Sequence, residues 1–189
     1  MHAEVFQIIP MSQQQQPKTG QTNLLLADDQ PANLSVPGTV LTDPGHARLS
    51  VTSGVSCGTL VLNGAGELLL CHVTNTARWD IPKGMRDAGE TALQAAMREL
   101  MEEAGLVFAP ERFEEIGLFD YRRDKRLHLF LVRGADQVDL RTLVCTSFFP
   151  HPKTGQPTPE ADGFRWAARN EIARLCWPNM GRRLLALDW

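Results

Sequence analysis

The sequence predicts an α/β protein from two strand-rich segments and a well-bounded helix between them. Residues 56–73 contain two apolar runs around the turn residues 63–66, and residues 113–132 contain two more around a charged turn. Both segments are typical of β-hairpins. The helix pattern covers residues 92–104, and its apolar stripe indicates that one side packs on a core.

The helix has a signal at each end. Thr91 and Gln94 have the spacing of a capping box, and Gly105 stands where a left-handed residue would end the helix. No glycine or proline interrupts the residues between these ends. The apolar stripe consists of Leu93, Ala96, Met97, Leu100 and Ala104.

Three carboxylates share another face of this helix. On a helical wheel, Glu102 and Glu103 fall within about 60° of Glu99. Crowded like charges disfavour a helix by about 0.2–0.5 kcal/mol per pair, and a divalent cation would offset this cost. Mg²⁺ is the natural candidate because it takes oxygen ligands and is commonly held by a few carboxylates and substrate phosphates. For an isolated Glu-Glu pair, a solvated acidic face would be the ordinary interpretation.

The spacing of the surrounding residues favours the metal site. The pattern is Gly84, five residues, Glu90, seven residues, Arg98-Glu99-Leu100, one residue, Glu102-Glu103, one residue and Gly105-Leu106. The chance of such a match in a chain this long is well below about one in a million. The pattern is a complete Nudix box, and the chain resembles the Nudix hydrolase family from about residue 56 to its C-terminus.

The resemblance implies a fold and a reaction. The fold is a Nudix-type α/β/α sandwich with a mixed β-sheet. The reaction is hydrolysis of a pyrophosphate linkage in a nucleoside diphosphate derivative, with Mg²⁺ or Mn²⁺ as the cofactor. The metal ligands would be Glu99, Glu102 and Glu103, completed by the backbone carbonyl of Lys83 or Gly84.

The other box residues have supporting tasks under this resemblance. Arg98 would orient one helix carboxylate, and we count it among the catalytic residues. Gly84, Glu90 and Gly105 would be structural: the glycines permit the turns that the backbone makes there, and Glu90 braces the site without binding metal.

Glu160 is a further candidate carboxylate. It stands six residues before Trp166, as in the diadenosine tetraphosphate hydrolase branch of the family. There it would serve as an additional metal ligand or as the general base. An exposed loop glutamate is the alternative interpretation, and Asp162 is a rival. The general base is left open between Glu99, Glu103 and Glu160.

The remaining segments are interpreted from their composition. Residues 138–149 are apolar enough for a strand, residues 150–159 are a loop by their proline and glycine content, and another strand begins at residues 163–166. Asn170 can cap a helix, and Pro178 suits the first turn of a second helical piece. We expect these helices to serve packing.

Substrate contacts are expected in three places. Lys83 lies beside the metal site and would contact a phosphate, although an ordinary solvated lysine is the alternative. A basic hairpin tip would neutralise a polyphosphate, although charged tips are usually only solvated; its residues are Arg122, Arg123, Lys125 and Arg126. A base would stack on Tyr121, Phe164 or Trp166, although aromatic residues in strands are more often core residues.

The leading substrate hypothesis is a dinucleoside polyphosphate, because residues 79–84 and 160–166 look most like the hydrolases of these compounds. The alternatives are a diphosphoinositol polyphosphate, ADP-ribose or a nucleotide sugar, an oxidised nucleoside triphosphate and an RNA 5′ end. A nucleotide-sensing module with little turnover is the alternative from another class. Such modules often lose box carboxylates, and here all are present.

Length, charge and cysteine content limit the partners. A chain of 189 residues is long enough for one domain and an additional segment. The formal net charge of -3 argues against a nucleic-acid partner. Four scattered cysteines predict reduced thiols in a cytoplasmic protein, and no apolar run approaches the ~20 residues of a membrane span. We expect a monomer or a homodimer acting on a small nucleotide or polyphosphate, with no membrane partner.

The predicted domain boundary lies near residue 47. Residues 1–47 contain the glutamine run 13–16 and read as a low-complexity, flexible N-terminal extension. Residues 48–189 are predicted to form the Nudix hydrolase domain.

Overall fold

Strand β1 (Gly54–Val61) is an inner strand of a four-stranded sheet with the order β4-β1-β6-β5. It pairs in parallel with β6 (Lys125–Val132) and antiparallel with β4 (Lys83–Met85). The edge strand β5 (Glu114–Arg122) pairs antiparallel with β6. The sheet is therefore mixed, as expected. The computed structural model describes residues 54–189, so the predicted extension, residues 1–47, lies outside the described residues.

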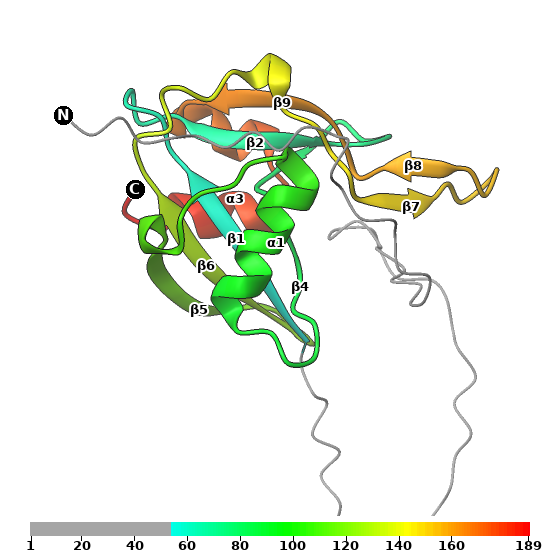
Figure 1. The fold of residues 1–189 in the computed structure, drawn as a ribbon, viewed down its shortest axis with the longest axis horizontal. Helices are drawn as coiled ribbons and strands as arrows, with labels where there is room; N and C mark the ends of the chain where they lie inside the picture. Colours follow the sequence, from blue (N-terminus) through cyan, green and yellow to red (C-terminus); the bar gives the residue numbers. More distant parts are fainter. Residues whose placement is uncertain (1–53) are drawn as a thin grey trace, which may run out of the picture.

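A second sheet has the order β3-β2-β9. It consists of β3 (Trp79–Asp80), β2 (Leu68–Val73) and β9 (Ala161–Ala167). Strands β7 (Phe148–Pro150) and β8 (Pro157–Pro159) pair only with each other and form a ribbon that projects from the body (Figure 1).

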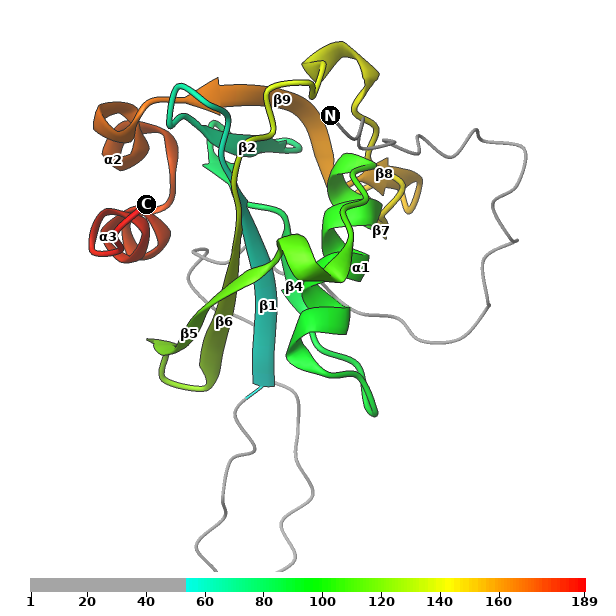
Figure 2. The same ribbon diagram turned by 60° about the vertical axis from the view of Figure 1, so that its left-hand side comes forward.

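Helices cover both faces of the main sheet (Figure 2). Helix α1 (Ala92–Ala104) lies on one face, and α2 (Ile172–Leu175) and α3 (Pro178–Leu185) lie on the other side. Short 3₁₀ helices cover Pro110–Arg112, Leu140–Thr142 and Arg169–Glu171. The fold is the α/β/α sandwich that the family resemblance implies.

The packing of β1 explains why the main sheet needs cover on both faces. Cys57 shares a buried cluster with Ala95 and Ala96 of α1, whereas Leu60 shares one with Met180 and Leu184 of α3. Successive strand side chains point to opposite faces, so a strand buried on both faces has an unbroken apolar run.

The two predicted hairpins have different outcomes. Residues 113–132 form the antiparallel pair β5–β6, as predicted. Residues 56–73 contain β1 and β2, but these strands belong to different sheets and share only the bridge between Leu62 and Leu68. The hairpin prediction was wrong for most of its length because β4 and β6 occupy both edges of β1.

The predicted helix ends are confirmed. The Thr91 hydroxyl accepts the Gln94 N–H at 3.2 Å, the Gln94 side chain accepts the Thr91 N–H at 2.9 Å, and Gly105 is left-handed with φ 68°. The predicted strand 138–149 was wrong, because this segment contains a 3₁₀ helix and only the first two residues of β7.

The C-terminal segment forms two short helices, as expected. Pro178 begins α3, but Asn170 caps neither helix, because it lies inside the 3₁₀ helix that precedes α2. No helix among residues 54–189 has both the length and the apolar character needed to cross a bilayer.

Candidate active site

The box loop and α1 meet at Gly84. A Cβ atom added there would lie 2.2 Å from the carboxyl atoms of Glu99, so only glycine lets this carboxyl group rest against β4. Pairing of Gly84 with Cys57 of β1 holds the loop in place. The glycine therefore sets the position of Glu99, as its predicted structural role requires.

Arg98 joins the loop to the helix. Its Nε and Nη2 atoms donate to the two Glu90 carboxylate oxygens at 2.8 and 3.0 Å, and Nη2 also donates to the Met85 carbonyl at 2.9 Å. Its Nη1 atom donates to Glu99 at 2.6 Å and to Glu102 at 3.0 Å. The hydrogen bonds from Arg98 hold the pKa of Glu90 below its ordinary value. Glu90 thus braces Arg98, which in turn orients two helix carboxylates.

The three helix carboxylates differ in their exposure to solvent. Glu99 and Glu103 are 7% and 9% exposed, whereas the Glu102 side chain is 35% exposed. Burial raises the pKa of Glu99 to about 7, although the Arg98 charge opposes this shift. Burial also raises the pKa of Glu103 well above its ordinary value, with the nearby Lys83 charge opposing it. These carboxyl groups are crowded in a place where negative charge is poorly solvated.

Glu160 joins this cluster from outside the helix. Burial raises the pKa of its carboxyl group, and the neighbouring side chains of Ser147 and Glu103 oppose this rise. Its backbone is held on both sides: its N–H donates to the Ser147 carbonyl, and its carbonyl accepts the Thr74 N–H, both at 3.0 Å. The rival Asp162 instead pairs with the His72 imidazole.

Lys83 lies beside the same cluster. Its backbone N–H donates to Glu103 Oε2 at 3.0 Å, and its Nζ atom lies 3.1 Å from Asp80 Oδ2. Asp80 is 5% exposed and is a site residue that the sequence analysis missed. The sequence signal that could have indicated this pair is the three-residue spacing of Asp80 and Lys83 just before Gly84. This spacing brings the two side chains together only because the loop turns as it does in the structure.

The donor set suits a hard divalent cation. As they stand, no three Asp, Glu, His or Cys side chains among residues 54–189 are arranged to hold one ion. Arg98 engages Glu99 and Glu102, and Glu103 accepts the Lys83 N–H beside Glu160. The residues nevertheless fit a divalent cation, because they supply crowded carboxylate oxygens, two of them from buried side chains, whose mutual repulsion the cation would relieve.

The predicted contacts on the basic hairpin tip lie away from the carboxylates. Lys125 pairs with Gly54 at the start of β1, whereas Lys83 pairs with Gly58, four residues along the same strand. This offset corresponds to about 13 Å along β1, in addition to the separation of β6 from β4. Arg123, in the turn between β5 and β6, is exposed.

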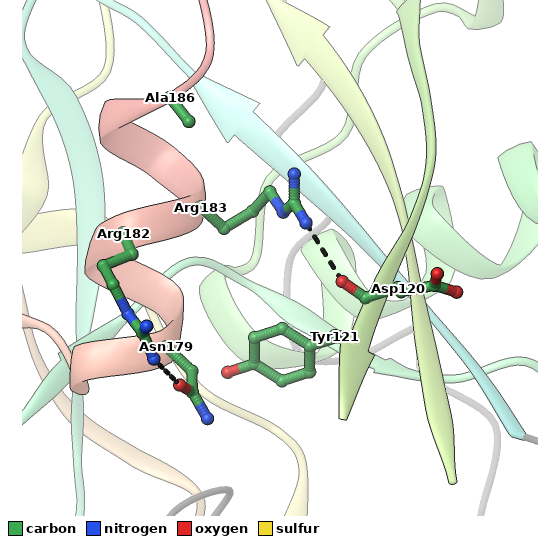
Figure 3. Close-up of a pocket in the computed structure, with 6 residues that line it drawn as sticks. All are labelled: Asp120, Tyr121, Asn179, Arg182, Arg183 and Ala186. Carbon is green, nitrogen blue, oxygen red and sulfur yellow. Dashed lines mark hydrogen bonds between the residues drawn. The ribbon is translucent and has the colours of Figure 1, made fainter. Parts of the chain in front are cut away.

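The predicted aromatic contacts also lie in other places. Tyr121 points into a pocket of about 290 Å³ between β5 and α3, beside Asn179, Arg182 and Arg183 (Figure 3). Helix α3, which lines this pocket, lies on the side of the main sheet opposite α1 (Figure 2). Trp166 packs against the buried cluster that contains Leu100 of α1. Of the predicted substrate contacts, the structure brings Lys83 to the carboxylates.

The site gathers carboxylate oxygens, the ligands that divalent cations such as Mg²⁺ take, against a glycine loop. Comparison with known proteins identifies the family. The family model of the NUDIX domain matches residues 52–187, and the chain belongs to the Nudix family. It is therefore a Nudix pyrophosphohydrolase.

The similar proteins carry different names. An uncharacterized 17.7 kDa protein of Enterobacteria phage T4 is 31% identical over 138 residues, which cover 68% of this chain and 91% of the relative. An RNA pyrophosphohydrolase of Erwinia tasmaniensis is 30% identical over 122 residues, which cover 59% of this chain and 67% of the relative. The crystal structure of an ADP-ribose pyrophosphatase from Streptococcus suis has a TM-score of 0.50 at 16% identity and covers 71% of this chain and 88% of its own. The structural likeness shows the fold alone.

Proposed function

We propose that the chain hydrolyses a pyrophosphate linkage in a dinucleoside polyphosphate, with Mg²⁺, or Mn²⁺ in its place, held by Glu99, Glu102 and Glu103. The observation that carries the proposed site is the meeting of Glu103 from α1 with Glu160 from the β8–β9 junction, beside Lys83. Two distant segments bring buried acids together at a cost in desolvation, which is typical of a functional site.

The chain's own groups have defined tasks in this reaction. When bound, the cation supplies charge neutralisation of the phosphates and a lower pKa for the attacking water. Arg98 keeps Glu99 and Glu102 in position. Asp80 holds the Lys83 ammonium group near the cluster, where it contacts a substrate phosphate.

Glu160 is our candidate for the general base. Its side chain is half-buried, and its backbone N–H donates to the Ser147 carbonyl at 3.0 Å, which fixes its place in the cluster. A carboxyl group with a raised pKa is better suited to accept a proton near neutral pH than an exposed one. Glu99 and Glu103 are the alternatives, and as ligands of the cation they would be less available as bases.

The substrate proposal rests on two segments, residues 79–84 and 160–166, which resemble those of dinucleoside polyphosphate hydrolases. Removal of pyrophosphate from RNA 5′ ends is the second candidate, because several relatives that are 30% identical carry the name RNA pyrophosphohydrolase. Both substrates present a polyphosphate attached to a nucleoside 5′ position, so the same cluster serves either reaction.

A substrate panel with Mg²⁺ tests the proposal. It contains diadenosine tetraphosphate, 5′-triphosphorylated RNA, ADP-ribose, an oxidised dNTP and a diphosphoinositol polyphosphate. We expect the highest kcat/KM with diadenosine tetraphosphate, and hydrolysis in ¹⁸O-labelled water identifies the phosphorus attacked. A preference for RNA would establish the second candidate, and preference for ADP-ribose or the oxidised dNTP would reject both. Nucleotide binding without turnover would instead establish a sensing module.

We also propose that residues 48–189 are the catalytic domain and that residues 1–47 take no part in the chemistry. Removal of residues 1–47 should leave kcat/KM within about 2-fold, and a larger loss would give the extension a catalytic role. The four free thiols support a reducing, cytoplasmic setting. Sedimentation would decide between a monomer and a homodimer.

A further inference from the structure

The β7–β8 ribbon begins at the carboxylate cluster. The Glu102 carbonyl accepts the N–H groups of Thr146 and Ser147 at 2.6 and 3.2 Å, and the Thr146 hydroxyl at 3.2 Å. The Glu160 N–H donates to the Ser147 carbonyl at 3.0 Å. The base of the ribbon is therefore fixed to α1 on one strand and continuous with Glu160 on the other, while its tip projects from the body (Figure 1).

The pairing register defines two faces on this ribbon. Phe149 pairs with Thr158, and Phe148 pairs with Pro159. The Glu160 N–H donates to the Ser147 carbonyl next to the Phe148–Pro159 pair, so Ser147 and Glu160 lie opposite each other and their side chains share one face. Strand side chains alternate between faces, so Phe149 lies on the same face as Ser147. By the same rule Thr158, on the other strand, lies on the same face as Glu160, and this is the face that Ser147 and Phe149 share. Phe148 lies on the opposite face.

Phe149 lies on the same face of the ribbon as the Glu160 side chain. It is two residues from Ser147, which corresponds to about 7 Å along the strand. Phe149 is half-buried, and within residues 54–189 it packs against none of the three core clusters. Its side chain therefore lies on the Glu160 face of the ribbon and outside these clusters.

We propose that Phe149 and Thr158 form a binding site for the nucleobase of the substrate, with the base stacked on the Phe149 ring beside the scissile phosphates. This proposal rests on the proposed function and adds a specificity-determining element to it. An aromatic ring recognises any planar base, and fixing the ribbon to α1 keeps the stacked base in register with the carboxylates. The ribbon thus selects nucleoside-linked polyphosphates over polyphosphates without a base.

The test compares Phe149→Ala with Phe148→Ala. The control removes the same ring from the adjacent position, where the side chain is 56% exposed on the other face. With diadenosine tetraphosphate, Phe149→Ala should raise KM about 10-fold with kcat nearly unchanged, and Phe149→Trp should restore KM. Phe148→Ala should match the parent. With a ribose 5-polyphosphate that lacks a base, all four proteins should be equal.

Three results would overturn the proposal. The first is an unchanged KM in Phe149→Ala, the second is an equal rise in KM in Phe148→Ala, and the third is an equal rise in KM of Phe149→Ala with the base-free substrate. Calorimetric titration with AMP and with pyrophosphate separates this failure from failure of the proposed function, because it needs no turnover. AMP should bind about 10-fold more weakly to Phe149→Ala while pyrophosphate binds equally. If AMP binds the parent and Phe149→Ala alike, the site is wrong even if the enzyme is active. If AMP affinity falls as expected in a protein that cleaves no member of the panel, the site stands and the proposed function fails.

Discussion

At the residue scale, Gly84 determines where the Glu99 carboxyl group lies. In Gly84→Ala, the new methyl group would meet that carboxyl at 2.2 Å and displace it. A misplacement of about 1 Å lowers turnover by about 100-fold, so we expect a loss of this size in kcat with a folded protein. Steady-state kinetics and circular dichroism measure the two quantities. Gly181→Ala is the control, because its Cβ would have ordinary contacts of 3.5 Å or more.

Glu160 and Asp162 provide a second test at this scale. Glu160 lies beside the Glu103 carboxyl, whereas Asp162 pairs with His72. If Glu160 is the general base, Glu160→Gln should lower kcat by about 100-fold or more. Asp162→Asn should retain nearly full activity. Kinetics of both variants over pH 5–9 would reveal the reverse order, which would transfer the role to Asp162.

The sequence predicted the box residues because a local spacing defines them. It did not predict Asp80 or Phe149. Asp80 reaches Lys83 only because the loop between β3 and β4 turns back, and Phe149 acquires its face from a pairing register that composition does not reveal. The spacing before Trp166 favoured Glu160 over its rival Asp162, and the structure places Glu160 beside Glu103 and pairs Asp162 with His72.

At the element scale, helix α1 is held by packing on the sheet and by its capping box. Thr91→Ala removes the hydroxyl that accepts the Gln94 N–H, which costs about 1 kcal/mol. We expect the melting temperature to fall by about 4 °C. Thr91→Ser retains an accepting oxygen and should melt like the parent. Equal melting of Thr91→Ala and the parent would contradict a stabilising role for this cap.

Helix α1, whose ends are marked by nearby residues, was predicted well. Strands whose pairing partners are distant in the sequence were predicted less well. The capping box and the left-handed Gly105 bounded α1 correctly. The segment 138–149 was predicted as a strand because of its apolar residues, but most of these residues pack under α1 without strand pairing. Val138, Leu140 and Leu143 lie in the apolar cluster that contains Leu100 of α1. β1 and β2 were joined into a hairpin because nothing local shows that β6, far along the chain, takes one edge of β1.

At the scale of the whole molecule, the buried thiols make the free energy of unfolding depend on pH. Burial raises the pKa of Cys57 to about 11 and that of Cys176 to about 12. Above pH 9 the unfolded chain loses thiol protons that the folded protein keeps until its own higher pKa values are reached. The contribution of these two thiols to the free energy of unfolding is therefore fully present below about pH 9, and it declines between pH 9 and 12.

Thiol reactivity measures this protection directly. At pH 8 we expect a disulfide reagent to modify Cys145, which is only partly buried, before Cys57, Cys71 and Cys176. In urea all four should react at one rate. The Cys145→Ser variant should lack the fast phase. Fast modification of Cys57 or Cys176 in the native protein would contradict their burial.

In the proposed function, the carboxylates gathered around Glu103 are the metal-dependent catalytic centre of the molecule. Glu103 is the point where α1, the Lys83 loop and Glu160 meet. The most direct test is the rate of diadenosine tetraphosphate hydrolysis by Glu103→Gln, measured against Mg²⁺ concentration up to saturation. We predict a folded protein whose kcat at saturating Mg²⁺ is lower by about 100-fold or more. A kcat equal to that of the parent at saturating Mg²⁺ would contradict the claim.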